Sequence, residues 1–228
     1  MTIIVFDLDD TLYDEITFVY SGFREVARFL ASSYSLSEDI LYADMLCELE
    51  QSGRGKVFDA ALQKAGIHSR ENVGSCLKVY RQHVPQIELF DDARRFLDRS
   101  APNSLYIVTD GNKLVQHRKV LALGLYDYPA IKKVYISRRF GVHNEKPSPH
   151  CFHLICAEEK VSANAVVYVG DNPAKDFVGI RPLGFRTVRI MRGNHKDVER
   201  EPHYEAEYRI HTLDELEDIL IEMNMDKG

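Results

Sequence analysis

The sequence predicts an α/β fold, a doubly wound, Rossmann-like parallel sheet with a helical domain inserted after its first strand. Two observations lead to this prediction. From about residue 91 onward, short apolar segments alternate with helix-like segments, which is typical of βαβ units and a parallel sheet. Residues 15–83 instead show helical patterns and no convincing strand. The predicted domains are therefore an α/β core (1–14 and 84–228) and a helical domain (15–83).

The chain opens with an apolar, β-branched segment at residues 3–6, which predicts a buried strand. In the helical segment, apolar residues recur at helical spacing, and Ser35 with Glu38 matches a capping box, an N-terminal helix signal. Turn-forming residues 51–56 interrupt this pattern. Further helices are expected at 57–65 and 71–83.

In the second half of the chain, four apolar segments predict strands, and amphipathic segments lie between them. The expected strands are 104–108, 133–137, 165–169 and 187–190. The expected helices are 91–98, 113–123, 149–158 and 174–180. A capping box at Thr212 and Glu215 predicts a last helix that runs to about Met223.

Composition excludes several classes of protein. The net charge of −6 over 228 residues argues against a general nucleic-acid binder, which needs a basic face. The first strand begins almost at Met1, leaving no room for a signal peptide, and no apolar stretch approaches the ~20 residues of a membrane span. The four cysteines form no CxxC pair. We expect a cytoplasmic protein without nucleic-acid or membrane partners; a homodimer remains open.

Polar groups follow the predicted strands where each one ends. Asp7 and Asp9 come directly after the first strand, Thr109 ends the second, and Asp171 follows a third. Ligands bind at the carboxyl ends of the strands in open α/β sheets. Carboxylates at the end of a buried strand are costly without a compensating cation, and Mg²⁺ takes oxygen ligands and bridges to phosphates. These groups suggest phosphoryl transfer, with a carboxylate as nucleophile and a neighbouring acid to protonate the leaving oxygen.

Four motifs resemble, in order, those of the haloacid dehalogenase (HAD) superfamily, in its phosphatase type with a helical cap domain inserted after the first core strand. They are Asp7-Leu8-Asp9-Asp10-Thr11, Thr109, Lys146, and Gly170-Asp171 with Asp176. The resemblance implies that Asp7 is the nucleophile and a Mg²⁺ ligand. It implies that Asp9 is the general acid/base, with its backbone carbonyl on the metal, and that Asp171 is a further metal ligand.

The same resemblance implies roles for the remaining motif residues. Thr109 would bind the transferring phosphoryl group, and Lys146 would hold both the nucleophile and the phosphate. Asp176 would support the metal site, through water or by positioning Lys146. Dehalogenases of this superfamily lack an acid two residues after the nucleophile, so Asp9 favours a phosphatase or a phosphomutase, whose leaving group needs a proton.

Three residues are candidates for substrate binding. Asn112 could touch phosphate or could serve only as a helix cap. Arg54 and Lys56 lie in the glycine-bounded break of the helical segment, where they could contact substrate or be solvated surface charges. The predicted function is a Mg²⁺-dependent phosphomonoesterase acting on a small phosphorylated metabolite, such as a sugar phosphate or a nucleoside monophosphate, through an aspartyl-phosphate. The alternatives are a phosphomutase of the same superfamily and a non-catalytic binding module.

Overall fold

The computed structural model describes residues 2–102 and 104–225 and divides into two compact units. The core unit comprises Met1–Glu15 and Glu88–Gly228, and the helical unit comprises Ile16–Ile87. Among the described residues, no helix combines the length and the apolar character that a membrane span requires.

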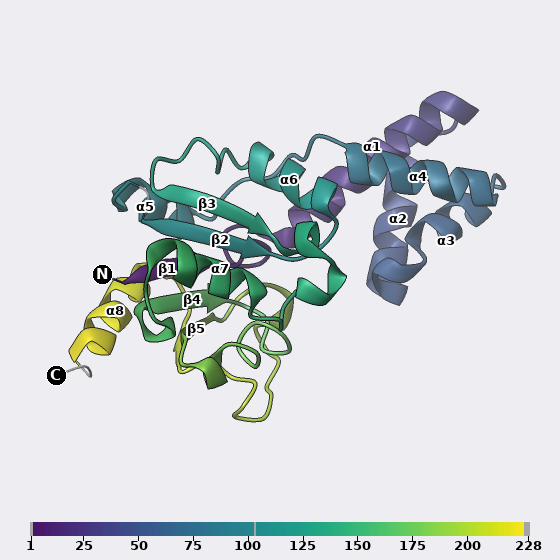
Figure 1. Ribbon diagram of the computed structural model, residues 1–228. Coiled ribbons are helices and arrows are strands. Elements are labelled where there is room, and N and C mark those ends of the chain that lie inside the picture. Colours follow the sequence, from purple (N-terminus) through teal and green to yellow (C-terminus); the bar gives the residue numbers. More distant parts are fainter. Residues whose placement is uncertain (1, 103, 226–228) are drawn as a thin grey trace. The chain divides into compact units, whose positions relative to one another are not determined.

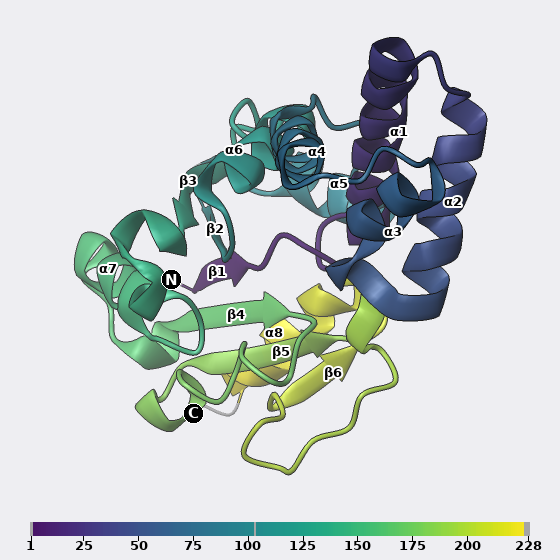
Figure 2. The same cartoon turned by 90° about the vertical axis from the view of Figure 1, so that its right-hand side faces the viewer.

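The core unit is built on a six-stranded parallel sheet with the order β3-β2-β1-β4-β5-β6. From β1 the chain proceeds outward to β2 and β3, and it then returns to the other side of β1 to add β4, β5 and β6 (Figures 1 and 2). The strands are β1 (Ile3–Phe6), β2 (Leu105–Thr109), β3 (Ile131–Ile136), β4 (Val166–Gly170), β5 (Arg186–Ile190) and β6 (Tyr208–Ile210). The prediction of a doubly wound parallel α/β sheet is confirmed.

Helices cover both faces of this sheet. They are α5 (Asp91–Arg99), α6 (Lys113–Ala122), α7 (His150–Glu159) and α8 (Leu216–Met225). On one face, Phe6 of β1 makes an edge-to-face contact with Phe96 of α5, the ring centroids being 5.5 Å apart. On the other face, Val5 belongs to a buried cluster with Phe152 of α7. Because successive side chains of a strand point to opposite faces, the wholly apolar β1 is buried on both sides.

Two parts of the core differ from the sequence-based expectation. Residues 174–180 form turns in place of the predicted helix. A Cβ added at Gly179 would lie 1.7 Å from the carbonyl oxygen of Pro147, so the chain must pass too close to the Lys146-Pro147 loop for any larger residue. The short strand β6 was not predicted. It is held in part by Thr187, whose amide donates to Glu207 and whose hydroxyl accepts from the Glu207 amide.

The helical unit consists almost entirely of helices, as predicted. They are α1 (Glu15–Tyr34), which starts at the end of the core unit, α2 (Glu38–Ser52), α3 (Val57–Lys64) and α4 (Arg70–Gln82). Their apolar faces share one buried cluster that includes Val26, Leu30 and Leu62. The predicted capping box at Ser35 is wrong. Ser35 has a positive φ of 53°, and it is Ser37 whose hydroxyl accepts from the amide of Ile40.

Candidate functional site

The site lies where the strand order reverses, between β1 and β4. Asp7 directly follows β1 and Asp171 directly follows β4. The two strands are adjacent and parallel, and the amide of Asp7 continues their pairing by donating to the carbonyl of Val169 at 2.8 Å. A reversal of strand order opens a crevice at the carboxyl ends of the strands, which is where open α/β sheets bind ligands.

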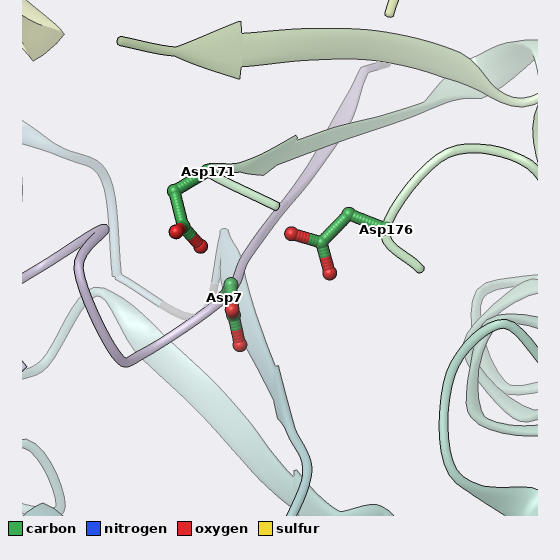
Figure 3. Close-up of side chains that lie close together, drawn as sticks. All are labelled: Asp7, Asp171 and Asp176. Atoms are coloured by element: carbon green, nitrogen blue, oxygen red, sulfur yellow. The ribbon is translucent and has the colours of Figure 1, made fainter. Parts of the chain in front are cut away.

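Three carboxylates meet at this edge of the sheet. Asp7, Asp171 and Asp176 are all buried, and each offers an oxygen that lies within 4.8 Å of the others (Figure 3). Asp176 comes from the turn that follows β4, where its Oδ2 accepts the amide of Asn172 at 2.9 Å. A helix was predicted for residues 174–180, and the turn found there directs Asp176 toward the other two acids.

Lys146 brings a single positive charge into this group. Its Nζ lies 2.9 Å from Asp7 Oδ1 and 2.8 Å from Asp176 Oδ1, and it donates to the hydroxyl of Tyr168 at 2.7 Å. The ammonium is buried, and although burial works against its charge, Asp176 and Asp7 hold the pKa of Lys146 well above its ordinary value. This lysine therefore stays protonated and links two of the three acids.

Lys146 does not balance three carboxylates, even with the weaker influence of Lys175, which lies 3.5 Å from Asp110 and also favours the ionised forms of Asp7 and Asp176. Burial, and then the neighbouring Asp176 and Asp7, raise the pKa of Asp171 to about 9. Burial also raises the pKa of Asp7 to about 7, even though Lys146 counteracts it. For Asp176 burial is outweighed by Lys146, which holds the pKa of this carboxyl below its ordinary value. A buried site with surplus acid and only oxygen donors fits a hard divalent cation such as Mg²⁺.

The carboxylate of Asp9 is hydrogen-bonded to other side chains of the core unit. Its Oδ1 accepts from the hydroxyl of Tyr13 at 2.5 Å and from Lys119 Nζ at 2.6 Å, and its Oδ2 accepts from Gln116 Nε2 at 2.7 Å. Burial would raise the pKa of Asp9, but Lys119 and the hydrogen bonds hold it below its ordinary value. Both carboxylate oxygens of Asp9 are thus bound by other side chains, and the contact of its backbone carbonyl with a metal, which the HAD resemblance implies, stays a prediction.

The turn that carries Asp7 and Asp9 is fixed by contacts from the start of α1 and from the loop after β5. Asp10, with a positive φ of 52°, accepts the amides of Glu15 at 2.9 Å and Asn194 at 3.0 Å. Gly193 packs directly against it, since a Cβ there would lie 2.2 Å from the Asp10 carboxyl carbon. Only glycine permits this approach.

The loop that carries Lys146 is tied to the end of β2. Asp110 Oδ1 accepts the amide of Lys146 at 3.1 Å and the hydroxyl of Ser137 at 2.6 Å. Glu145, bound by both ends of the Arg138 guanidinium at 2.9 Å, accepts the amide of Gly111 at 2.8 Å. These bonds set the distance between Lys146 and the residues that follow β2.

Of the other predicted residues, two lie in the core unit and two in the helical unit. Thr109, at the end of β2, is fully buried, and its Oγ1 lies 3.0 Å from Gln116 Nε2. Asn112 caps α6, with Oδ1 accepting two amides of the first turn. Arg54 and Lys56 are exposed in the helical unit, within and directly after the 3-10 turn Gly53–Gly55. A role for Asn112, Arg54 and Lys56 in substrate binding stays a prediction.

Three residues around the site escaped the sequence reasoning: Tyr168, Gln116 and Lys119. Tyr168 was assigned only to a strand, although its hydroxyl links Lys146 with Asp176, 3.2 Å away. Gln116 and Lys119 lie three positions apart in α6, so they share the face of that helix that also buries Val120. Polar residues at the spacing of an apolar stripe are the signal that could have identified them.

Comparison with known proteins agrees with this geometry. Residues 1–184 match the family model described as haloacid dehalogenase-like hydrolase. A glyceraldehyde 3-phosphate phosphatase of Methanocaldococcus jannaschii is 29% identical, over 98% of each chain. A phosphoserine phosphatase of Thermus thermophilus is 28% identical over 72% of this chain and 63% of its own. Human N-acylneuraminate-9-phosphatase is 25% identical over 88% of each.

Solved structures share the fold. The HAD-hydrolase YfnB from Bacillus subtilis superposes with a TM-score of 0.63 at 20% identity, covering 96% of this chain and 98% of its own. A HAD-superfamily hydrolase from Geobacter sulfurreducens gives a TM-score of 0.67 at 18% identity, over 96% of both chains. With a family match over most of its length and an acidic group at the reversal of the strand order, the chain belongs to the haloacid dehalogenase-like hydrolases.

Proposed function

We propose that this protein is a Mg²⁺-dependent phosphomonoesterase that hydrolyses a small phosphorylated metabolite through an aspartyl-phosphate intermediate. The coarser part of this statement, a HAD-like hydrolase of phosphate monoesters, follows from the family match and from relatives that are named phosphatases. The observation that supports the finer part is the group of three buried carboxylates and one buried lysine at the carboxyl end of β1.

The nucleophile in this proposal is Asp7. One of its carboxylate oxygens forms a bond to phosphorus while the bond from phosphorus to the substrate's leaving oxygen breaks. Lys146, 2.9 Å from Asp7, favours the ionised form of this carboxylate and faces the same site, where its charge also stabilises the phosphoryl oxygens. Thr109 donates its hydroxyl to the phosphoryl group.

Asp9 completes the two proton transfers. In its protonated form it gives a proton to the leaving oxygen, and in its ionised form it takes one from the water that cleaves the aspartyl-phosphate. The hydrogen bonds to Tyr13 and Lys119 stabilise the ionised form, which is the form that the second step needs. The sum of the steps is a phosphate monoester and water converted to an alcohol and inorganic phosphate.

Asp7 and Asp171 would hold the Mg²⁺ ion, together with the backbone carbonyl of Asp9. Asp176 supports this site and positions Lys146. When bound, the cation supplies positive charge that offsets the surplus carboxylates and the charge of the phosphoryl group. The pKa of Asp171 is raised in the metal-free protein, and the positive charge of a bound cation would lower it again.

For the substrate we propose a small phosphorylated metabolite such as a sugar phosphate or a nucleoside monophosphate. The names of the relatives cover a three-carbon sugar phosphate, a phosphorylated amino acid and a phosphorylated acyl sugar, all of them small. Arg54 and Lys56 are the proposed contacts of the helical unit with the substrate body, and Asn112 a proposed contact beside the phosphate.

A screen of phosphorylated metabolites with Mg²⁺, read out as released phosphate, tests the proposal. We expect turnover of at least one sugar phosphate or nucleotide, and loss of turnover in excess chelator and in Asp7→Asn. The exposed Asp197→Asn is the matched control and should retain full activity. Activity of Asp7→Asn at the wild-type level would refute the covalent route. Turnover that appears only with trace bisphosphate, and as isomerisation, would indicate a phosphomutase instead.

A further inference from the structure

Helix α6 presents two polar side chains to the carboxylate of Asp9. Gln116 and Lys119 are each only 3% exposed, although both belong to residue types that normally reach solvent. Lys119 Nζ lies 2.6 Å from Asp9 Oδ1 and 3.6 Å from Glu15 Oε1. Gln116 Nε2 lies 2.7 Å from Asp9 Oδ2. Each oxygen of this carboxylate is therefore bound from the same helix.

The amide of Gln116 has a defined orientation. Its Nε2 is within hydrogen-bond range of three oxygens, those of Asp9, Thr109 and the Asp110 backbone, while its Oε1 is buried without a partner among the described residues. Rotating the amide by half a turn would place Oε1 against the Asp9 carboxylate and the Asp110 carbonyl, so the orientation shown is the stable one.

This arrangement also orients the hydroxyl of Thr109. A hydroxyl that accepts a hydrogen bond from Gln116 has its own hydrogen directed elsewhere. Gln116 thus connects the residue proposed to bind the phosphoryl group with the residue proposed to move the proton. Fold stability alone gives no reason to bury an amide with an unsatisfied oxygen and an ammonium on a helix face where apolar side chains would pack.

We infer that Gln116 and Lys119 are positioning residues of the reaction, which fix the Asp9 carboxylate by binding one oxygen each. The inference rests on the acid/base role proposed for Asp9. A misplacement of about 1 Å in a reacting group can cost about 100-fold in rate, so loss of either contact should be measurable.

The test combines Gln116→Met and Lys119→Met with Asp9→Asn in a double-mutant cycle. Activity is measured on an alkyl phosphate and on p-nitrophenyl phosphate, whose leaving group needs little protonation. Each single variant should lower kcat on the alkyl phosphate about 10- to 100-fold and on the aryl phosphate much less. In the Asp9→Asn background neither substitution should lower kcat further, because residues that act through Asp9 have no effect once it cannot transfer a proton.

Two further measurements separate positioning from folding. Far-UV circular dichroism establishes that each variant is folded, and Gln63→Met and Lys64→Met make the same chemical changes at exposed positions, the second also removing an ion pair with Asp44. Both controls should keep wild-type kcat. Losses that are equal on the two substrates, or that multiply with the loss in Asp9→Asn, would overturn the inference and leave the proposed function intact. An Asp9→Asn variant with full activity on the alkyl phosphate would overturn both.

Discussion

Replacing Asp171 with asparagine, which does not titrate, should change how the stability of the metal-free protein depends on pH. Asp171 is 4% exposed, and its pKa of about 9 results from burial and from the nearby Asp176 and Asp7. In the unfolded chain an aspartate has a pKa of about 3.9. At pH 7 to 8 the folded protein therefore holds a proton on Asp171 that the unfolded chain has lost.

The direction and the magnitude of the pH dependence of stability follow from this difference in bound protons. Because the folded state binds more protons, the free energy of unfolding falls as the pH rises, by about 1.4 kcal/mol per pH unit for one proton. An asparagine side chain resembles the protonated acid in shape and charge but does not titrate, so Asp171→Asn should lack this contribution. Between pH 7 and 8, the free energy of unfolding of the wild type should fall by about 1.4 kcal/mol more than that of the variant. Asp7, with a pKa of about 7, contributes to both proteins.

Urea unfolding followed by circular dichroism at pH 7 and 8, in the presence of a chelator, measures this quantity. Asp197→Asn, which changes an exposed acid, should behave like the wild type. Added Mg²⁺ should stabilise the wild type more at pH 8 than at pH 7, because binding to the ionised acid requires the proton to leave. If the free energy of unfolding depends on pH equally in the wild type and in Asp171→Asn, Asp171 does not carry the raised pKa that a bound cation would lower.

Three other variants give expected outcomes. Asp9→Asn should slow hydrolysis of an alkyl phosphate by about 10²–10⁴-fold and of p-nitrophenyl phosphate by less, in steady-state assays; equal losses would argue against proton transfer by Asp9. Lys146→Met should abolish turnover and lower the free energy of unfolding by about 3–5 kcal/mol in urea titrations, since two buried carboxylates lose their cation; a change below about 1 kcal/mol would contradict this. Replacing both Arg54 and Lys56 with alanine should lower kcat/KM for the natural substrate but hardly affect p-nitrophenyl phosphate. Parallel losses would mean that these residues serve closure or folding.

Sequence patterns were sufficient for the sheet and for the acids at its edge. The alternation of apolar strands and helices is a local property, and it predicted five of the strands of the core and the helical insertion between β1 and β2. Asp7 and Asp171 follow directly from their strands, so any parallel arrangement of β1 and β4 brings them to the same edge. The family resemblance, carried by motifs in order, needed nothing more than the sequence.

Tertiary structure decided what each of these acids faces. Asp176 was expected on a helix, but it lies in a turn that also carries Gly179 past Pro147, and its carboxylate is 2.8 Å from Lys146 Nζ. Two of the three side chains that bind Asp9, Gln116 and Lys119, lie more than a hundred positions away in the sequence and meet it only when α6 packs beside the end of β1. The sequence determined which groups could take part, since strand ends depend on neighbouring residues. Contacts between distant segments, which no local pattern encodes, determined how those groups are charged and held.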